Sequence, residues 1–206
     1  MNERSPTVFV VDDDAAVRKA VARLPHSVRI EAAVFASPVE FLAAYDPDIP
    51  GCLLLDLEMP DLNGLELQQA LTERGGALPI IFLSAHGDVP LSVQAMKAGA
   101  SDFLTKPVRD QVLRAALRAA FEKDRVARLV RAELTGIEAR LATLTPREHE
   151  VLERVIAGQL NKQIAGDLGT GEHTMKVHRA RVMEKMKVES LAELVRLVER
   201  ARAPRR

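Results

Sequence analysis

Short apolar runs alternate with segments of helical spacing throughout residues 1–122, and this alternation restricts the fold more than any other feature of the sequence. The apolar runs are rich in β-branched and aliphatic residues, which favours strands. They lie at Thr7–Asp14, Arg29–Ser37, Cys52–Leu57, Leu78–Ala85 and Ser101–Pro107. The helical segments lie at Ala15–Leu24, Pro38–Tyr45, Asn63–Gly75, Val89–Ala100 and from Arg109 onward. Five strands that alternate with five helices predict an α/β fold with a doubly wound, five-stranded parallel sheet.

The remainder of the chain has helical patterns alone. Between Asp110 and Leu141 there is no proline, and Gly136 is the one glycine. This segment is either one long helix or two nearly continuous helices that meet at Gly136. Thr145 and Glu148 then form the pattern of a capping box around Pro146, which marks a helix start.

Four short helices follow that start, and a tight turn separates the middle pair. They lie at Pro146–Ala157, Lys162–Asp167, Glu172–Lys187 and Leu191–Ala201. This arrangement predicts an all-α helix-turn-helix domain. The chain is therefore divided into an α/β domain at residues 1–122, a helical linker at 123–142 and a helix-turn-helix domain at 143–206.

The formal net charge of zero hides a difference between the two halves. Residues 1–122 contain 11 Lys and Arg against 17 Asp and Glu, whereas residues 123–206 contain 18 against 12. An acidic part joined to a basic part suggests two domains with different partners. The basic part is a candidate for binding nucleic acid.

Several protein classes are disfavoured by the sequence. No apolar run approaches the roughly 20 residues that span a bilayer, and acidic residues follow the N-terminus too early for a secretion signal. Cys52 is the single cysteine and cannot form an internal disulfide, which fits a reducing compartment. We expect a cytoplasmic protein without a membrane partner.

Polar residues follow the apolar runs at the points where a parallel sheet binds its ligands, the carboxyl ends of its strands. They are Asp12, Asp13, Asp56, Ser84 and Lys106. A single aspartate after a strand is usually a turn residue or a helix cap. Polar residues at successive strand ends are harder to explain by turns and indicate a site.

This set of side chains suits phosphoryl chemistry. The carboxylates of Asp12, Asp13 and Asp56 are hard oxygen ligands of the kind that Mg²⁺ prefers. A carboxylate beside Mg²⁺ can attack a phosphoryl group and become an aspartyl phosphate. The transferred group needs positive charge and hydrogen-bond donors, which Lys106 and Ser84 can supply. The Lys106–Pro107 peptide could be cis or trans.

The stretches VVDDD, LLLDLEMPDLNGLEL and FLSAHGDVPLSVQAMKAGASDFLTKP resemble the receiver domain of bacterial two-component response regulators. The resemblance covers about residues 5–122 and implies a flavodoxin-like fold. It implies that Asp56 accepts phosphate from a sensor histidine kinase. It also implies that Mg²⁺ is bound by Asp13, Asp56 and the backbone carbonyl of Glu58, with Asp12 contributing through water.

The same resemblance assigns Ser84 and Phe103 to the switch pair of the family. The hydroxyl is expected to turn toward the phosphate while the aromatic ring moves inward. A packing role in the core is the alternative for Phe103.

The stretch from Leu144 to Val198 resembles the LuxR-type DNA-binding domain of the FixJ/NarL response regulators, with Glu172–Lys187 as the recognition helix. The resemblance places Lys176, Val177 and Ala180 where the family reads base edges of double-stranded promoter DNA. Phosphate contacts are expected from Lys162, Thr174 and Arg181. In the family, the last helix pairs two such domains on DNA.

Five positions depart from the family pattern, among them Thr170, which replaces a usual apolar residue, and His173, which replaces a usual Arg. Gly171 stands where Ser or Thr usually caps the recognition helix, at a cost of only a few tenths of a kcal/mol. Pro25 replaces a common leucine, and Arg29 replaces a helix-ending glycine. We expect a short or kinked first helix.

The prediction is a transcriptional regulator in which phosphate on Asp56 controls dimerisation and promoter binding. Its expected partners are a sensor histidine kinase, promoter DNA and a second copy of the chain, with RNA polymerase as a further candidate. The alternative is a phosphate-independent DNA-binding regulator that uses the receiver only for dimerisation.

A rival from another class is a phosphotransferase or phosphatase of the haloacid-dehalogenase type. Such enzymes usually carry a second aspartate two residues after the nucleophile, and here Glu58 stands at that position. We therefore expect no catalysis on an external substrate.

Overall fold

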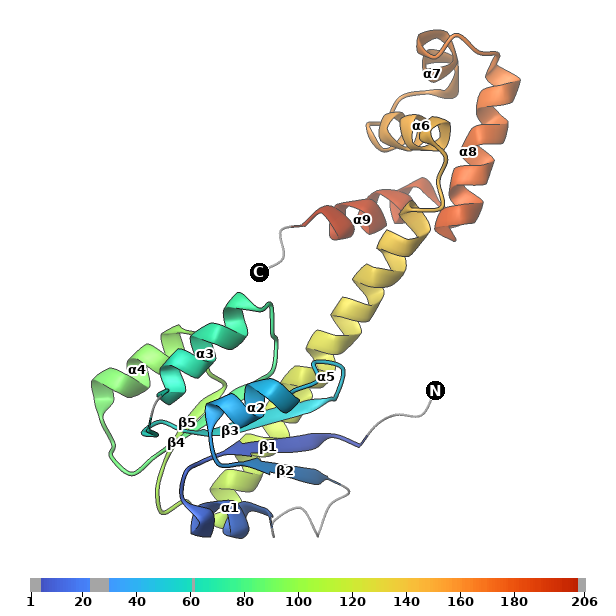
Figure 1. The fold of residues 1–206 in the computed structure, drawn as a ribbon. Coiled ribbons are helices and arrows are strands. Elements are labelled where there is room, and N and C mark those ends of the chain that lie inside the picture. The colour runs from blue at the N-terminus through green and yellow to red at the C-terminus, as the bar shows by residue number, and fades with distance from the viewer. Residues whose placement is uncertain (1–4, 23–29, 61, 204–206) are drawn as a thin grey trace. The chain divides into compact units, whose positions relative to one another are not determined.

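The computed structural model of the chain describes residues 5–22, 30–60 and 62–203. The chain divides into two compact units, Met1–Arg128 and Leu129–Arg206. Figure 1 labels the helices and strands of both. The division falls inside the range 123–142 that the sequence suggests for the linker.

A five-stranded parallel sheet forms the centre of the first unit, in the order β2-β1-β3-β4-β5. The strands are β1 (Thr7–Val11), β2 (Glu31–Phe35), β3 (Gly51–Asp56), β4 (Ile80–Ser84) and β5 (Asp102–Thr105). The helices are α1 (Ala15–Ala22), α2 (Pro38–Ala44), α3 (Gly64–Glu73), α4 (Val89–Lys97) and α5 (Asp110–Leu141). The predicted doubly wound fold is confirmed. Pro25 and Arg29, on which the expected kink depends, lie outside the described residues.

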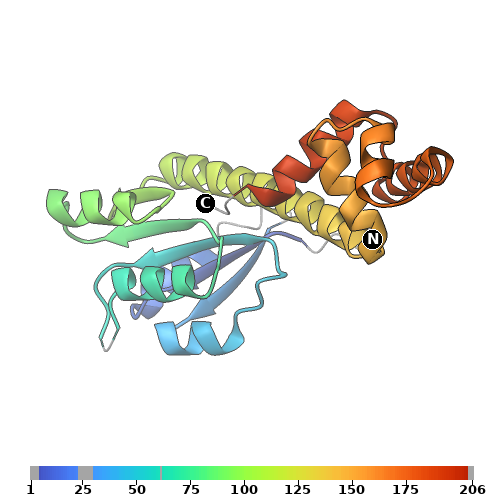
Figure 2. The same ribbon diagram turned by 90° about the horizontal axis from the view of Figure 1, so that it is seen from above.

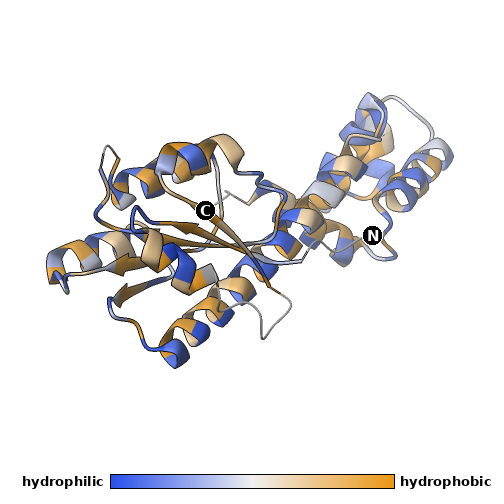
Figure 3. Cartoon of the chain, turned by 60° about the horizontal axis from the view of Figure 1, so that its bottom comes forward, coloured by the Kyte–Doolittle hydropathy of each residue, from blue (hydrophilic) through white to orange (hydrophobic). Residues whose placement is uncertain are grey.

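Two apolar cores cover the two faces of this sheet. On one face Phe9, Leu53 and Phe82 pack against α2, α3 and α4. On the other face Val10 and Leu54 pack against α1 and α5. Figure 2 shows α2 and α5 on opposite sides of the sheet, and the strands are largely orange in the hydropathy colouring of Figure 3. β1, β3 and β4 are buried along their whole length, so the sequence can use near-continuous apolar runs there.

Strand register brings the expected site residues to one edge. Val11 pairs with Leu55, Asp56 pairs with Leu83, and Ser84 pairs with Thr105. Asp12 and Lys106 each follow the last residue of a strand. The carboxyl ends of β1, β3, β4 and β5 therefore form one polar edge.

Gly64 begins α3 directly against the strand that carries Asp56. A Cβ atom at this position would lie 2.5 Å from the carbonyl oxygen of Asp56 and 2.9 Å from a ring carbon of Phe82. The backbone N–H of Gly64 donates to the carbonyl of Leu57 at 3.0 Å. Only glycine allows this close approach, so the start of α3 packs directly against the end of β3.

Helix α5 is one continuous helix of 32 residues. Gly136 lies inside it, so the alternative of two helices joined at Gly136 is wrong. Its earlier part contributes Leu113, Ala116, Leu117 and Ala120 to the core of the first unit. In the second unit, Ile137 is 1% exposed and belongs to the apolar core. Buried side chains in both units keep the helix continuous through a residue of low helix propensity.

The second unit contains α6 (Pro146–Ile156), α7 (Asn161–Asp167), α8 (Glu172–Met186) and α9 (Leu191–Arg202). The predicted capping box of Thr145 and Glu148 is present at the start of α6. Gly171 caps α8 without a side-chain hydrogen bond, as its residue type requires. Val151, Met175 and Leu194 are among the buried residues that join the helices in one core.

Two further properties bear on function. Among the described residues, no helix is long and apolar enough to cross a membrane. Cys52 is fully buried in β3, and burial, with the nearby charge of Asp124, raises the pKa of its thiol to about 12. The thiol is a packing group of the sheet and is chemically inert.

Candidate functional site

Three carboxylates meet at the carboxyl edge of the sheet. One ligand oxygen from each of Asp12, Asp13 and Asp56 lies within 4.8 Å of the others. Asp12 is fully buried, Asp56 is 6% exposed and Asp13 is exposed. The loop after β1 supplies the first two carboxylates, and the end of β3 supplies the third. The sequence predicted this cluster correctly, because parallel strands end at the same edge.

Lys106 joins two of these carboxylates. Its Nζ lies 2.8 Å from Oδ2 of Asp12 and 3.1 Å from Oδ1 of Asp56. Oδ1 of Asp56 also accepts a hydrogen bond from the backbone N–H of Leu57 at 2.9 Å. The Lys106–Pro107 peptide is cis. Three carboxylates beside one ammonium leave an excess of negative charge.

Burial and the bonds to Lys106 shift the pKa values of the site. Burial raises the pKa of the Asp56 carboxyl, and the hydrogen bond and charge of Lys106 oppose this shift without cancelling it. Burial alone would lower the pKa of Lys106, but its bonds to Asp12 and Asp56 outweigh burial, so its pKa is raised. A further cation would relieve the excess charge. The three hard oxygen donors fit Mg²⁺, with no soft ligand among them.

Ser84 and Phe103 lie in the same region. Oγ of Ser84 donates to the carbonyl of His86 at 2.7 Å and accepts from the backbone N–H of His86 at 3.1 Å. Phe103 is half-buried beside Phe82, with ring centroids 6.2 Å apart. A hollow of about 370 Å³ borders Phe103, Met96 and Thr105. Phe103 thus packs on the core and also faces a space.

The side chain of Glu58 lies at the rim of the site. Its Oε1 is 3.4 Å from Nδ1 of His86, and both side chains are exposed. The expected role of the Glu58 backbone carbonyl as a metal ligand stays a prediction. The contact with His86 was not predicted, because it joins the ends of β3 and β4 through side chains alone.

Sequence reasoning also missed Arg18 on α1. Its Nη1 donates to the backbone carbonyls of Asp12 and Asp13, at 2.6 and 2.8 Å. A helical spacing of four residues from Asp14 is the available signal, because it returns the side chain of Arg18 to the turn before the helix.

The predicted DNA contacts are all exposed in the second unit. Lys162 lies on α7, and the other five lie on α8: Thr174, Lys176, Val177, Ala180 and Arg181. Lys176 lies 3.7 Å from Glu172 in an exposed ion pair. Met175, Val182 and Met186 are buried on the opposite side of α8. The helix therefore presents one face to the core and another to solvent.

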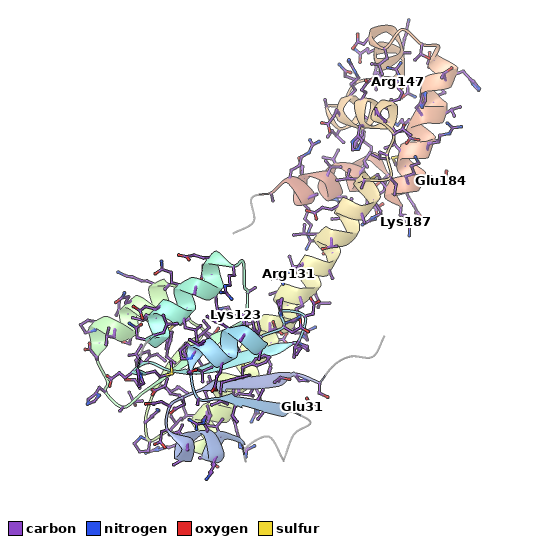
Figure 4. The ribbon with its side chains drawn as sticks, in the orientation of Figure 1. Glu31, Lys123, Arg131, Arg147, Glu184 and Lys187 are labelled. Atoms are coloured by element: carbon purple, nitrogen blue, oxygen red, sulfur yellow. The ribbon has the colours of Figure 1, made fainter. Side chains whose placement is uncertain are left out.

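Two other cations of α8 are engaged within the domain. Lys185 donates to Oε2 of Glu148 at 2.6 Å, and Arg179 donates to Oδ1 of Asn161 at 3.1 Å. Glu184 and Lys187 instead point away from the helix into solvent (Figure 4). The sequence could not separate the engaged cations Arg179 and Lys185 from the exposed Lys187, because all three fit a basic helix surface.

Comparisons with known proteins agree with both halves of the molecule. Residues 8–118 match the model of the response regulator receiver domain, and residues 142–198 match that of bacterial regulatory proteins of the luxR family.

Three relatives illustrate the similarity. The chain is 44% identical to nodulation protein W of Bradyrhizobium diazoefficiens, over 93% of this chain and 85% of that protein. It is 43% identical to transcriptional regulatory protein FixJ of Azorhizobium caulinodans, over 92% and 90% respectively. The solved structure of the response regulator StyR matches with a TM-score of 0.86 and 46% identity, covering 95% of this chain and 98% of that one.

Proposed function

Because this chain belongs to the two-component response regulators of the FixJ/NarL type, which join a receiver to a LuxR-type DNA-binding domain, we propose that phosphate on Asp56 controls its binding to promoter DNA. The phosphate comes from a sensor histidine kinase. The observation that carries this proposal is the juxtaposition of Asp12, Asp13, Asp56 and Lys106 at one sheet edge.

The phosphoryl transfer is a displacement at phosphorus. A carboxylate oxygen of Asp56 forms the new P–O bond, the P–N bond of the kinase phosphohistidine breaks, and the imidazole nitrogen keeps the electron pair. Lys106 pairs with charge on the phosphoryl oxygens, since its ammonium already lies 3.1 Å from Asp56. Asp13, Asp56 and the backbone carbonyl of Glu58 would hold Mg²⁺, with Asp12 contributing through water, and the cation would supply positive charge opposite the carboxylates and the phosphoryl oxygens.

Ser84 and Phe103 carry the change away from the site. Oγ of Ser84 exchanges its bond to the carbonyl of His86 for a bond to the phosphate. Phe103 moves inward at the same time, and the hollow beside it gives the ring space. The remodelled surface of α4, β5 and α5 then favours a homodimer. A phosphate adds about −1.5 to −2 charges locally, so a two-state element of this kind is needed to extend its effect.

The second unit binds double-stranded promoter DNA through α8. Lys176, Val177 and Ala180 read base edges, while Lys162, Thr174 and Arg181 contact phosphates. RNA polymerase is a further partner at the promoter. The protein acts in the cytoplasm, where its DNA target lies, and it turns over no external substrate.

The test is phosphorylation with a small donor. The full chain is incubated with Mg²⁺ and acetyl phosphate and weighed by mass spectrometry. We expect the mass of one phosphoryl group on the wild type and on Asp88→Asn, an exposed control, and no gain on Asp56→Asn. An equal gain on Asp56→Asn, or none on the wild type, contradicts the proposal.

Two further measurements separate the rivals. Steady turnover of an added phosphomonoester would favour the enzyme. If Asp56→Ala left promoter binding and transcription unchanged by the phosphodonor, the receiver would act only as a phosphate-independent dimerisation module.

A further inference from the structure

Arg18 bonds to the backbone that carries two of the three site carboxylates. A single nitrogen, Nη1, reaches both the carbonyl oxygen of Asp12 at 2.6 Å and that of Asp13 at 2.8 Å. The side chain starts from the first turns of α1 and is half-buried. Hydrogen bonds from a charged donor are shorter and stronger than neutral ones, and these two distances are short.

The two carboxylates of this loop are fixed to different degrees. In Asp12, Oδ1 accepts from the backbone N–H of Asp14 at 2.9 Å and Oδ2 pairs with Lys106 at 2.8 Å. The carboxylate of Asp13 is exposed, and its direction follows from the backbone beneath it. The carbonyl of Asp13 is one of the two that Arg18 binds. Arg18 thus holds the backbone of Asp13, the residue of the three whose carboxylate is exposed to solvent.

We propose that Arg18 is a positioning residue, which holds the Asp12–Asp13 backbone so that its carboxylates converge with Asp56 on a divalent cation. This inference rests on the proposed phosphorylation site and concerns how that site is built. Arg18 makes no contact with the reacting atoms in this role. It acts through the main chain of Asp12 and Asp13.

The direction in which removal of Arg18 changes cation binding distinguishes a positioning role from an effect of its charge. As a nearby positive charge, Arg18 would oppose cation binding, and its removal would tighten that binding. As a positioning residue it favours binding, and its removal would weaken it. High salt screens the effect of the Arg18 charge, since the Debye length is only about 3 Å at 1 M ionic strength. The positioning effect remains at high salt.

The experiment is a titration of the full chain with magnesium chloride, followed by amide chemical shifts in NMR spectra. It compares the wild type, Arg18→Met and Lys19→Met in low and high salt. Lys19 is the matched control, because it is an exposed lysine on the same helix and loses the same charge. We expect Arg18→Met to raise the Kd for Mg²⁺ about tenfold at both salt concentrations, the loss typical of residues that orient metal ligands. Lys19→Met should leave the Kd nearly unchanged or slightly lower.

Hydrogen exchange supplies a readout that does not depend on the cation. Amides of the loop at residues 12–14 should exchange faster in Arg18→Met and at the wild-type rate in Lys19→Met. If Arg18→Met folds poorly, Arg18→Gln replaces it, with the same expected result.

The possible failures are distinct. An unchanged or lower Kd in the Arg18 variant overturns the positioning role and leaves the proposed phosphorylation intact. A wild type that binds no Mg²⁺ at millimolar concentration overturns both.

Discussion

Glu148 shows how a single residue can serve two elements. It caps the start of α6 by accepting from the backbone N–H of Thr145 at 2.8 Å, and it accepts from Lys185 of α8 at 2.6 Å. These bonds lower the pKa of the Glu148 carboxyl to about 2, with the bond from Lys185 as the largest cause. Lys185 also donates to the carbonyl of Thr143 at 3.0 Å. The ionised carboxylate therefore ties α8 to the start of α6.

The depressed pKa predicts how the stability of the second unit depends on pH. Because the folded pKa lies below the ordinary value of 4.5, the stabilisation is complete above that pH and is lost as the pH falls toward 2. Glu148→Gln should lower the free energy of unfolding by about 1–2 kcal/mol at neutral pH. The difference from wild type should shrink steadily below pH 4.5.

Chemical denaturation at a series of pH values measures this dependence. Glu150→Gln is the control, since Glu150 is exposed on the same helix. A difference between wild type and Glu148→Gln that stays constant down to pH 2 would contradict the assignment.

The sequence predicted the positions of those site residues that follow from the topology of the sheet. Asp12, Asp13 and Lys106 follow strands and Asp56 ends one, and parallel strands must end together. Arg18 was not predictable in this way, because its partners are backbone carbonyls. Every residue type has a backbone carbonyl, so the residue types at positions 12 and 13 do not reveal that these carbonyls accept hydrogen bonds.

Strand β3 is held in place at both of its ends. Gly64 lies against the backbone of Asp56 at its carboxyl end. At its other end, Oδ2 of Asp124 accepts from the backbone N–H of Gly51 at 2.9 Å. Asp124 is buried on α5 and pairs with Nε of Arg128 at 2.8 Å. The strand that carries Asp56 is therefore bonded directly to α5.

Arg128 extends this contact to the segment before β3. Its guanidinium donates to three carbonyls in that segment, those of Pro47, Asp48 and Ile49. The last turns of α5 in the first unit thus belong to the folded receiver. They lie beyond residue 122, where the sequence pattern placed the end of the domain.

Breaking this pair should destabilise the first unit. Asp124→Asn keeps an acceptor for Gly51 but removes the charge opposite Arg128, so we expect a loss of about 2 kcal/mol in the free energy of unfolding. Amides of residues 45–51 should exchange faster with solvent. Hydrogen exchange on the full chain measures both effects and assigns them to the first unit.

The control lies one turn earlier on the same helix. Arg125 and Glu122 form an exposed pair at 2.6 Å, and Arg125→Gln should change stability little because water competes for both groups. Equal effects of the two substitutions would show that the buried pair has no special role.

The length of α5 illustrates what an element's own sequence leaves undecided. Gly136 costs a helix about 1 kcal/mol relative to alanine, which made a joint as reasonable as a continuous helix. Packing decides the outcome, because Ile137 is buried beside it and Arg140 donates to the carbonyl of Gly136 at 3.1 Å. The burial of Ile137 depends on core residues that lie far away in the chain, which the pattern of α5 alone does not reveal.

The negative net charge of the first half of the chain and the positive net charge of the second half cancel, so the whole chain has a formal net charge of zero. DNA affinity should nevertheless fall steeply with salt, because the basic half displaces counterions from the phosphates. The substitutions Lys162→Ala and Lys176→Ala should affect DNA binding in different ways. The first should weaken binding to cognate and random DNA equally and reduce the salt slope by about 1. The second should weaken cognate binding more, by about 1–3 kcal/mol.

Fluorescence anisotropy with a footprinted promoter fragment and a scrambled one provides the measurement. Arg196→Ala, an exposed change on α9, controls for the general loss of positive charge. An equal loss on both fragments for Lys176→Ala would make Lys176 a phosphate contact.

The buried thiol of Cys52 has a practical consequence for such measurements. With a pKa of about 12 and no exposed surface, it will not react with maleimide or iodoacetamide reagents in the folded protein. The chain also contains no tryptophan. One engineered surface cysteine in one unit and one engineered tryptophan in the other would thus be unique reporters, and together they would form a pair of distance-sensitive probes in solution.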